Sequence, residues 1–217
     1  HGIDIWLTTI AINENFKMCQ VPLGTKIEDN REAASSFDPG FVQSVGTLFR
    51  MMEIYRRRWG ETRPLRAAPV HGNGIHADTQ RLTATITVNM LSDAFQSGTR
   101  RFRRLWRSIM GPNNYREVID LANRQRGATH FSAELWSRIV FDFAVVYNKG
   151  ENDPDKVVAA LLPLYYARTA AILRETGGKL EAVEQAVQAQ AQSFAEQKPY
   201  LVRRWQTYVP WAIEGVR

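Results

Sequence analysis

Asp4, in the opening stretch Gly2-Ile3-Asp4, is the first residue of the chain whose type and position suit a role in catalysis. Asp4 lies at the edge of the apolar segment GIDIWLTTIAIN, in which Ile3, Leu7 and Ile10 recur at helical spacing. A carboxylate at a helix start can orient an attacking hydroxyl and receive its proton, and the helix dipole keeps that carboxylate ionised. The simpler interpretation is that Asp4 only caps the helix, and the two roles are compatible.

The four histidines are weaker candidates. His71 and His76 lie five residues apart in a glycine-containing loop, which is not the helical spacing of a metal-binding pair, and no third ligand completes a zinc site there. His130 precedes a helix start and is expected to act locally, and His1 is the first residue. The sequence contains no motif of a serine hydrolase, a P-loop ATPase, a zinc protease or a dinucleotide-binding domain.

The segment RRFRRLWR at 100–107 is both basic and amphipathic. Five arginines surround three apolar residues at helical spacing. We expect a helix that turns Phe102, Leu105 and Trp106 toward the core, while its arginines are solvated, paired or in contact with a partner subunit. Binding of nucleic acid or of an anionic membrane by this face is the alternative.

Composition and charge place the chain among ordinary globular proteins. Of the 217 residues, 44% are hydrophobic and 23% are charged, and the formal net charge of +6 suits anionic partners without selecting one. Cys19 is the only cysteine, which excludes an internal disulfide and favours a reducing, cytoplasmic location. No signal peptide is evident, and the apolar run at 157–173 is interrupted by Pro163 and Arg168, so we expect no membrane span.

Capping residues and apolar periodicity predict a mainly helical chain. Asp38-Pro39, Ser132 and Asp153-Pro154 are helix starts, and Asn15, Gly60 and Gly177-Gly178 are helix ends. The predicted helices cover 3–15, 39–60, 79–110, 114–125, 133–148, 154–176 and 179–197, with a kink at Pro163. Residues 16–24 are typical of a short strand, and the β-branched run at 82–88 leaves a strand open there.

The first thirty residues, HGIDIWLTTIAINENFKMCQVPLGTKIEDN, resemble the end of the catalytic domain of retaining GT-A glycosyltransferases, in particular the mannosylglycerate and glucosylglycerate synthases. That family has a G-I-D helix start, a helix of this length, a strand and a P-x-G-x-K turn in the same order. The resemblance continues less specifically into FDPGFVQSVGTLFRMME and HFSAELWSRIVFDFAVVYN. It implies that Asp4 contacts the acceptor hydroxyl or the face of the sugar at which transfer takes place.

The same resemblance implies a metal ligand in the turn after Gly24. The family usually has a histidine there, which helps upstream D-x-D carboxylates to hold the metal that binds the donor diphosphate. By count this position is Glu28, with Asp29 as a rival one residue later. A carboxylate suits Mg²⁺ or Mn²⁺, so the departure changes the ligand without excluding the metal; a solvated loop acid is the alternative.

The sequence thus predicts a mainly α chain with a short αβ remnant of a GT-A nucleotide-sugar domain at 1–33 and a helical domain at 34–217. The implied activity is transfer of a sugar from a nucleotide-sugar donor to a small hydroxy acid such as glycerate. The family's nucleotide-binding sheet and D-x-D motif precede the G-I-D element, so we expect these 217 residues alone to be inactive. The alternatives are a helical nucleic-acid-binding module and an oligomerisation domain that packs against a second copy of itself.

Overall fold

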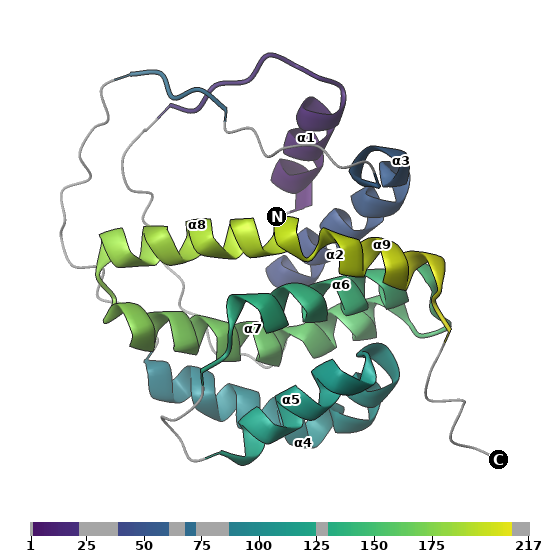
Figure 1. Ribbon diagram of the computed structural model, residues 1–217, viewed down its shortest axis with the longest axis vertical. Coiled ribbons are helices and arrows are strands. Elements are labelled where there is room, and N and C mark those ends of the chain that lie inside the picture. Colours follow the sequence, from purple (N-terminus) through teal and green to yellow (C-terminus); the bar gives the residue numbers. More distant parts are fainter. Residues whose placement is uncertain (1, 22–38, 61–67, 73–86, 125–129, 210–217) are drawn as a thin grey trace. The chain divides into compact units, whose positions relative to one another are not determined.

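Helices account for most of the chain that the structure describes (Figure 1). The computed structural model describes residues 2–21, 39–60, 68–72, 87–124 and 130–209. Within these residues extended pairing is limited to one isolated bridge, and no strand is formed. The chain divides into two compact units, His1–Ile86 and Thr87–Arg217, which are described separately below. The mainly α class predicted from the sequence is confirmed.

The first unit contains α1 (Gly2–Asn13), α2 (Pro39–Ile54) and α3 (Arg56–Trp59). α1 packs against α2, and Gly2 permits this contact because a Cβ there would lie 2.6 Å from Thr47 Oγ1. Asn15 adopts a positive φ of 58° after the last turn of α1, so it closes the helix as predicted. The expected helix over 39–60 is interrupted at Tyr55, whose hydroxyl donates to Glu14 at 3.0 Å.

The residues after α1 are extended only briefly. Gln20 pairs in parallel with Val70: its N–H donates to the Pro69 carbonyl, and its carbonyl accepts from the His71 N–H, both at 2.8 Å. Of the strand predicted at 16–24, residues 16–21 are described; they form no strand, and Gln20 alone pairs. The predicted domain boundary between 33 and 34 and the helix cap at Asp38 lie outside the described residues. Of the alternative strand at 82–88 only Thr87 and Val88 are described, and they are the N-cap and the first residue of helix Val88–Ile109.

The second unit consists of helix pairs in three layers (Figure 1). Its helices are α4 (Val88–Ile109), α5 (Pro112–Asn123), α6 (Ala133–Lys149), α7 (Pro154–Thr176), α8 (Leu180–Glu196) and α9 (Lys198–Gln206). α6 and α7 form the middle layer, α4 and α5 cover one side, and α8 and α9 cover the other. The core therefore lies around α6 and α7, whose buried side chains include Ile139, Phe143, Leu161 and Leu164.

The helix starts of this unit follow the predicted capping chemistry. The Ser132 hydroxyl accepts from the Leu135 N–H at 3.1 Å, and an Asp153 carboxylate oxygen accepts from the Asp155 N–H at 3.1 Å. Gly177 ends α7 in the left-handed conformation. α9 was not predicted from the sequence; it follows α8 with only Gln197 between them.

α4 and α7 approach each other closely at a glycine. A Cβ on Gly98 would lie 2.2 Å from Pro163 Cβ, so only glycine allows this approach. The indole N–H of the fully buried Trp106 donates to the Ala160 carbonyl at 2.7 Å, which ties the same two helices together. α7 continues as one helix through Pro163. By length and composition α7 is also the one described helix that could cross a membrane, but 56% of its most apolar window is buried inside the protein, as in the core helix of a globular unit.

Candidate functional site

Asp4 lies in the first turn of α1, and its side chain is exposed. Its position at a helix start is therefore as predicted, and solutes can reach the carboxylate. No side-chain partner of Asp4 is found among the described residues. Its contribution to a reaction stays a prediction.

The helix that carries Asp4 is apolar on all sides. α1 has Asp4 as its only charged residue, yet none of its side chains is buried. Ile3, Trp6, Leu7 and Ile12 are between 46% and 63% exposed. A helix that is apolar all round is normally enclosed by protein. Among the described helices, α1 departs most from this rule, because it is apolar in composition and yet exposed to solvent.

The metal site predicted in the turn after Gly24 depends on Glu28, with Asp29 as the rival position. Glu28 and Asp29 lie outside the described residues. Among the residues that the structure does describe, no three His, Cys, Asp or Glu side chains come together in a way that could hold a metal ion. Asp153-Pro154-Asp155 has the letters of a D-x-D motif, but Asp153 caps α7 and lies 3.7 Å from the Lys156 ammonium.

The histidines take part in local contacts. His130 Nδ1 lies 2.8 Å from a Glu175 carboxylate oxygen at the surface of the second unit. His71 contributes its backbone N–H to the bridge with Gln20. His76 and His1 lie outside the described residues.

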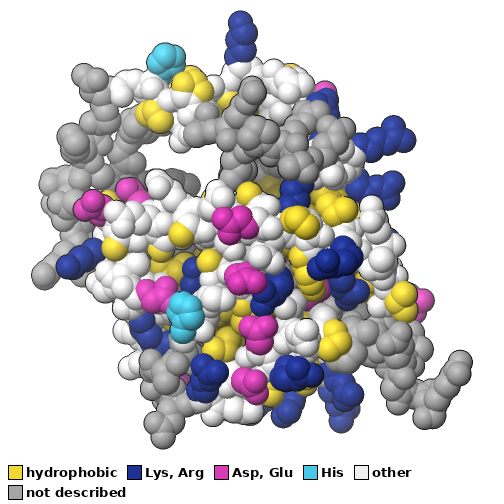
Figure 2. Space-filling model, in the orientation of Figure 1, with side chains coloured by type: hydrophobic (Ala, Val, Ile, Leu, Met, Phe, Trp, Pro, Cys, Tyr) yellow, Lys and Arg dark blue, Asp and Glu magenta, His cyan; other side chains and the backbone are white. Residues whose placement is uncertain are grey.

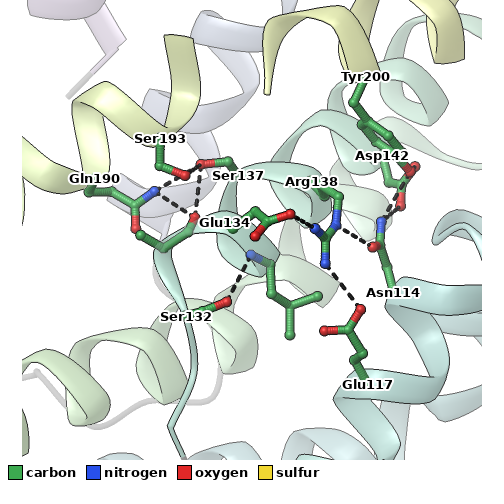
Figure 3. A network of polar contacts seen from close by, with 12 residues as sticks. Asn114, Glu117, Ser132, Glu134, Ser137, Arg138, Asp142, Gln190, Ser193 and Tyr200 are labelled. Carbon is green, nitrogen blue, oxygen red and sulfur yellow. Dashed lines mark hydrogen bonds and ion pairs between the residues drawn. The ribbon is translucent and has the colours of Figure 1, made fainter. Parts of the chain in front are cut away.

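The most developed polar arrangement in the described part of the chain surrounds Asp142, near the middle of α6 (Figure 3). Asp142 is fully buried. Its Oδ1 accepts from the Tyr200 hydroxyl at 2.7 Å and from Arg204 Nε at 3.0 Å. Its Oδ2 accepts from Asn114 Nδ2 at 2.7 Å and from the Gly111 N–H at 2.9 Å. One carboxylate thus joins α6 to the start of α5 and to α9.

This network continues to the surface through Arg138. Arg138 Nε donates to the Asn114 side-chain oxygen at 2.9 Å, and its other nitrogens contact Glu117 at 3.0 Å and Glu134 (Figure 3). Arg204 also donates to the Ile109 carbonyl at 3.2 Å. Two arginines thus lie at opposite ends of a chain of hydrogen bonds, and only its outer end is exposed.

A second group of polar contacts joins α6, α7 and α8. Gln190 Nε2 donates to Ser137 Oγ at 2.9 Å, and Gln190 Oε1 accepts from Arg168 Nε at 3.0 Å. Arg168 also donates to the Phe131 carbonyl at 2.7 Å. Burial lowers the pKa of the Arg168 guanidinium, and the nearby Glu175 opposes that change.

The Asp142 network stabilises the fold and shows no feature of a reactive centre. Each oxygen of Asp142 already accepts two hydrogen bonds, so neither has a free position for a substrate. Burial raises the pKa of Tyr200, and the Asp142 charge raises it further, which keeps the hydroxyl protonated and donating. The sequence analysis missed this network. Its one signal was an acid inside the apolar run IVFDFAVV.

A small hollow on the second unit is lined by polar and apolar side chains from α4, α5 and α7. Ser92, Gln96, Arg124 and Arg174 are the polar residues that line it, and Phe95 contributes an apolar wall. Its volume of about 30 Å³ is room for about one or two water molecules, which is far too small for a nucleotide sugar. Arg174 already donates to the Ser92 hydroxyl at 2.7 Å.

The arginines of the 100–107 segment lie on α4 as predicted. The side chains of Phe102 and Leu105 are half-buried and Trp106 is fully buried, so the apolar stripe faces the core. All five arginines are exposed.

Comparisons with protein-family models, with curated proteins and with solved structures gave no match for this chain.

Proposed function

We propose that this chain forms the acceptor side of a retaining GT-A glycosyltransferase, which moves a sugar from a nucleotide-sugar donor to a small hydroxy acid such as glycerate. The observation that carries the proposal is the exposed carboxylate of Asp4 in the first turn of α1, with an isolated bridge at Gln20 farther along the chain. The resemblance to the mannosylglycerate and glucosylglycerate synthases implies a G-I-D helix start at this place; only the Gln20 bridge corresponds to their strand, and their P-x-G-x-K turn lies outside the described residues.

The proposed role of Asp4, to orient the acceptor hydroxyl and accept its proton, suits its position at a helix start. The acceptor hydroxyl must lose its proton as it attacks the sugar, and a carboxylate within hydrogen-bonding distance can orient that hydroxyl. The first turn of a helix stabilises the negative charge. Because the Asp4 side chain is exposed, a small hydroxy acid can approach it directly.

The surroundings of α1 support a larger catalytic domain. Its apolar side chains need a cover, and the donor-binding sheet that the family places before the G-I-D element is an apolar layer of the right kind. The same upstream part would supply the D-x-D carboxylates, with Glu28 as the contribution of this chain to a Mg²⁺ or Mn²⁺ site.

The proposal is first tested on the DNA that precedes the codon for His1. An apolar strand followed by D-x-D is expected roughly a hundred residues upstream, the size of one typical domain. The protein encoded with that part is then assayed for glycerate-dependent release of nucleoside diphosphate from GDP- and UDP-sugars. The 217-residue chain alone is expected to give no turnover.

The role of Asp4 is tested by Asp4→Asn in the same longer protein. We expect kcat to fall by about a hundredfold or more, because the amide cannot accept the proton. Thermal stability should change little, since the side chain is exposed. Asp120→Asn, which removes an exposed acid from α5, is the matched control and should retain full activity. Equal kcat values for the two variants would exclude Asp4 from the reaction.

A further inference from the structure

Four arginines form one exposed stripe along α4. Arg100, Arg103, Arg104 and Arg107 follow the i, i+3, i+4, i+7 spacing that places side chains on one helix face, and all four are exposed. We call this stripe the α4 arginine face. Figure 2 shows one face of the molecule, on which dark blue Lys and Arg side chains are spread over the surface and several lie beside magenta Asp and Glu side chains. At 1.5 Å per residue the stripe is about 10 Å long.

The α4 arginine face is held by a fixed scaffold. The opposite side of the helix is buried through Leu91, Phe95, Trp106 and Ile109. Trp106 is fully buried and bonded to α7, and Gly98 lies against Pro163 of the same helix. The arginines therefore project from a rigid element whose apolar side is already engaged, so α4 cannot turn that side toward another partner.

The positive charges of this face are not balanced within the described residues. The ion pairs found there involve none of the four arginines, and the nearest polar contact is a long one of 3.4 Å from Arg103 Nε to the Tyr115 hydroxyl. Arg138 differs sharply, since it contacts two carboxylates. Like charges at i, i+3 and i+4 repel and destabilise a helix, and an anionic partner would remove that cost.

The chemistry of the face favours a rigid phosphate backbone. Arginine binds phosphate oxygens through two parallel N–H donors, which lysine cannot do, and α4 contains no lysine. The only exposed large apolar side chain of α4 is Met90, ten residues before Arg100, so the face lacks the apolar anchor of membrane-bound helices. It also presents no exposed aromatic ring on which unpaired bases could stack, because Phe102 is half-buried under Arg101, whose guanidinium lies 5.0 Å from its ring centre.

We propose that the α4 arginine face binds the phosphate backbone of double-stranded nucleic acid without sequence preference. The helix lies against the backbone with its four guanidinium groups on phosphates, and the net charge of +6 favours the encounter. Four phosphate contacts give a slope of about −3.6 for log K against log salt concentration. The face belongs to the second unit and does not depend on Asp4, so this binding stands or falls separately from sugar transfer.

The test measures fluorescence anisotropy of a short labelled DNA duplex with the 217-residue chain, between about 50 and 200 mM NaCl. The variant R100Q/R104Q/R107Q should weaken binding by about tenfold or more and reduce the slope by about 2.7. The control R56Q/R57Q/R203Q removes the same charge from exposed arginines elsewhere and should bind within a few-fold of the parent chain. R100K/R104K/R107K retains the charge and should retain most of the salt dependence.

Three results would overturn the proposal. One is equal weakening by the site variant and the charge-matched control, which would indicate only general attraction. Another is absence of duplex binding together with binding to vesicles of phosphatidylglycerol and phosphatidylcholine, which would assign the face to a membrane. The third is duplex binding by the parent chain that does not change with salt. Circular dichroism shows whether the glutamine variant folds, and if it does not, the lysine variant and the salt slope of the parent chain decide the question.

Discussion

Replacing Asp142 by asparagine removes one charge from a fully buried polar group of the second unit while keeping its shape. Asp142 is 0% exposed and the Arg204 side chain 13% exposed, and their closest atoms lie 3.0 Å apart. Removing one partner of a buried ion pair typically costs about 3–5 kcal/mol, because the other charge stays buried without compensation. Asparagine also places an NH₂ donor where one of the two carboxylate oxygens now accepts. Whichever oxygen it replaces, this NH₂ faces groups that already donate to that position.

The expected loss for Asp142→Asn is therefore about 4 kcal/mol in the free energy of unfolding. A whole domain is stable by only about 5–15 kcal/mol, so this loss is a large share of the total. It corresponds to a fall in Tm of about 10–20 °C for a unit of this size. Thermal unfolding followed by circular dichroism, together with urea unfolding, measures both quantities.

Glu117→Gln is the matched control because it makes the same carboxylate-to-amide change in the same network, at its exposed end. Glu117 is 49% exposed and Arg138 keeps its contacts with Glu134 and Asn114, so we expect a loss of less than about 1 kcal/mol. If the two variants lost the same small amount, the Asp142 network would not stabilise the fold as argued here. The reasoning would then have overestimated what burial adds to the interaction between charges.

Two further predictions concern the same unit. Gly98→Ala should lower the free energy of unfolding, measured by chemical denaturation, by about 2–3 kcal/mol or more, because a Cβ 2.2 Å from Pro163 forces α4 and α7 apart. Ser97→Ala, on the exposed side of α4, is the control and should be nearly neutral. A Gly98→Ala protein as stable as the parent chain would show that this close approach is not required. Because burial and the Asp142 charge raise the pKa of Tyr200 above the ordinary 10, its contribution to stability is complete below pH 10 and is lost as the pH rises from there toward the folded-state pKa. The free energy of unfolding is measured at pH 9 and at pH 11 for the parent chain and for Tyr200→Phe. Between these pH values the parent chain should lose about 1 kcal/mol more than the variant. Equal losses would contradict the direction assigned to the pKa of Tyr200.

Local signals in the sequence predicted the helices of the second unit well. Ser132, Asp153 and Gly177 act through hydrogen bonds or backbone angles within a few residues, so their effect can be recognised without knowing the fold. The break at Tyr55 was not predicted, because nothing in GTLFRMMEIYRRRW interrupts the helical pattern. α9 was also not predicted, because it has only nine residues and follows α8 after a single residue, so no loop sequence marks its start.

The Asp142 network could not be predicted because its members are far apart in sequence. Asn114, Asp142 and Tyr200 come from three helices, and each is unremarkable where it stands. A pattern of apolar residues locates the buried side of a helix but does not say which donors arrive there from other helices. An acid in a buried apolar run indicates only that donors must be supplied from somewhere.

The cost of leaving a side chain exposed to water differs between the two surfaces for which a function is proposed, the α4 arginine face and helix α1. Exposed arginines remain hydrated, and the repulsion among them is small, so the α4 arginine face needs no partner for the second unit to fold. Exposed apolar surface is costly at about 25 cal/mol per Å², and α1 leaves large apolar side chains exposed around a single acid. The proposal of a larger catalytic domain therefore depends more on the exposed apolar side chains of Trp6 and Leu7 than on Asp4, which a simple helix cap would explain equally well.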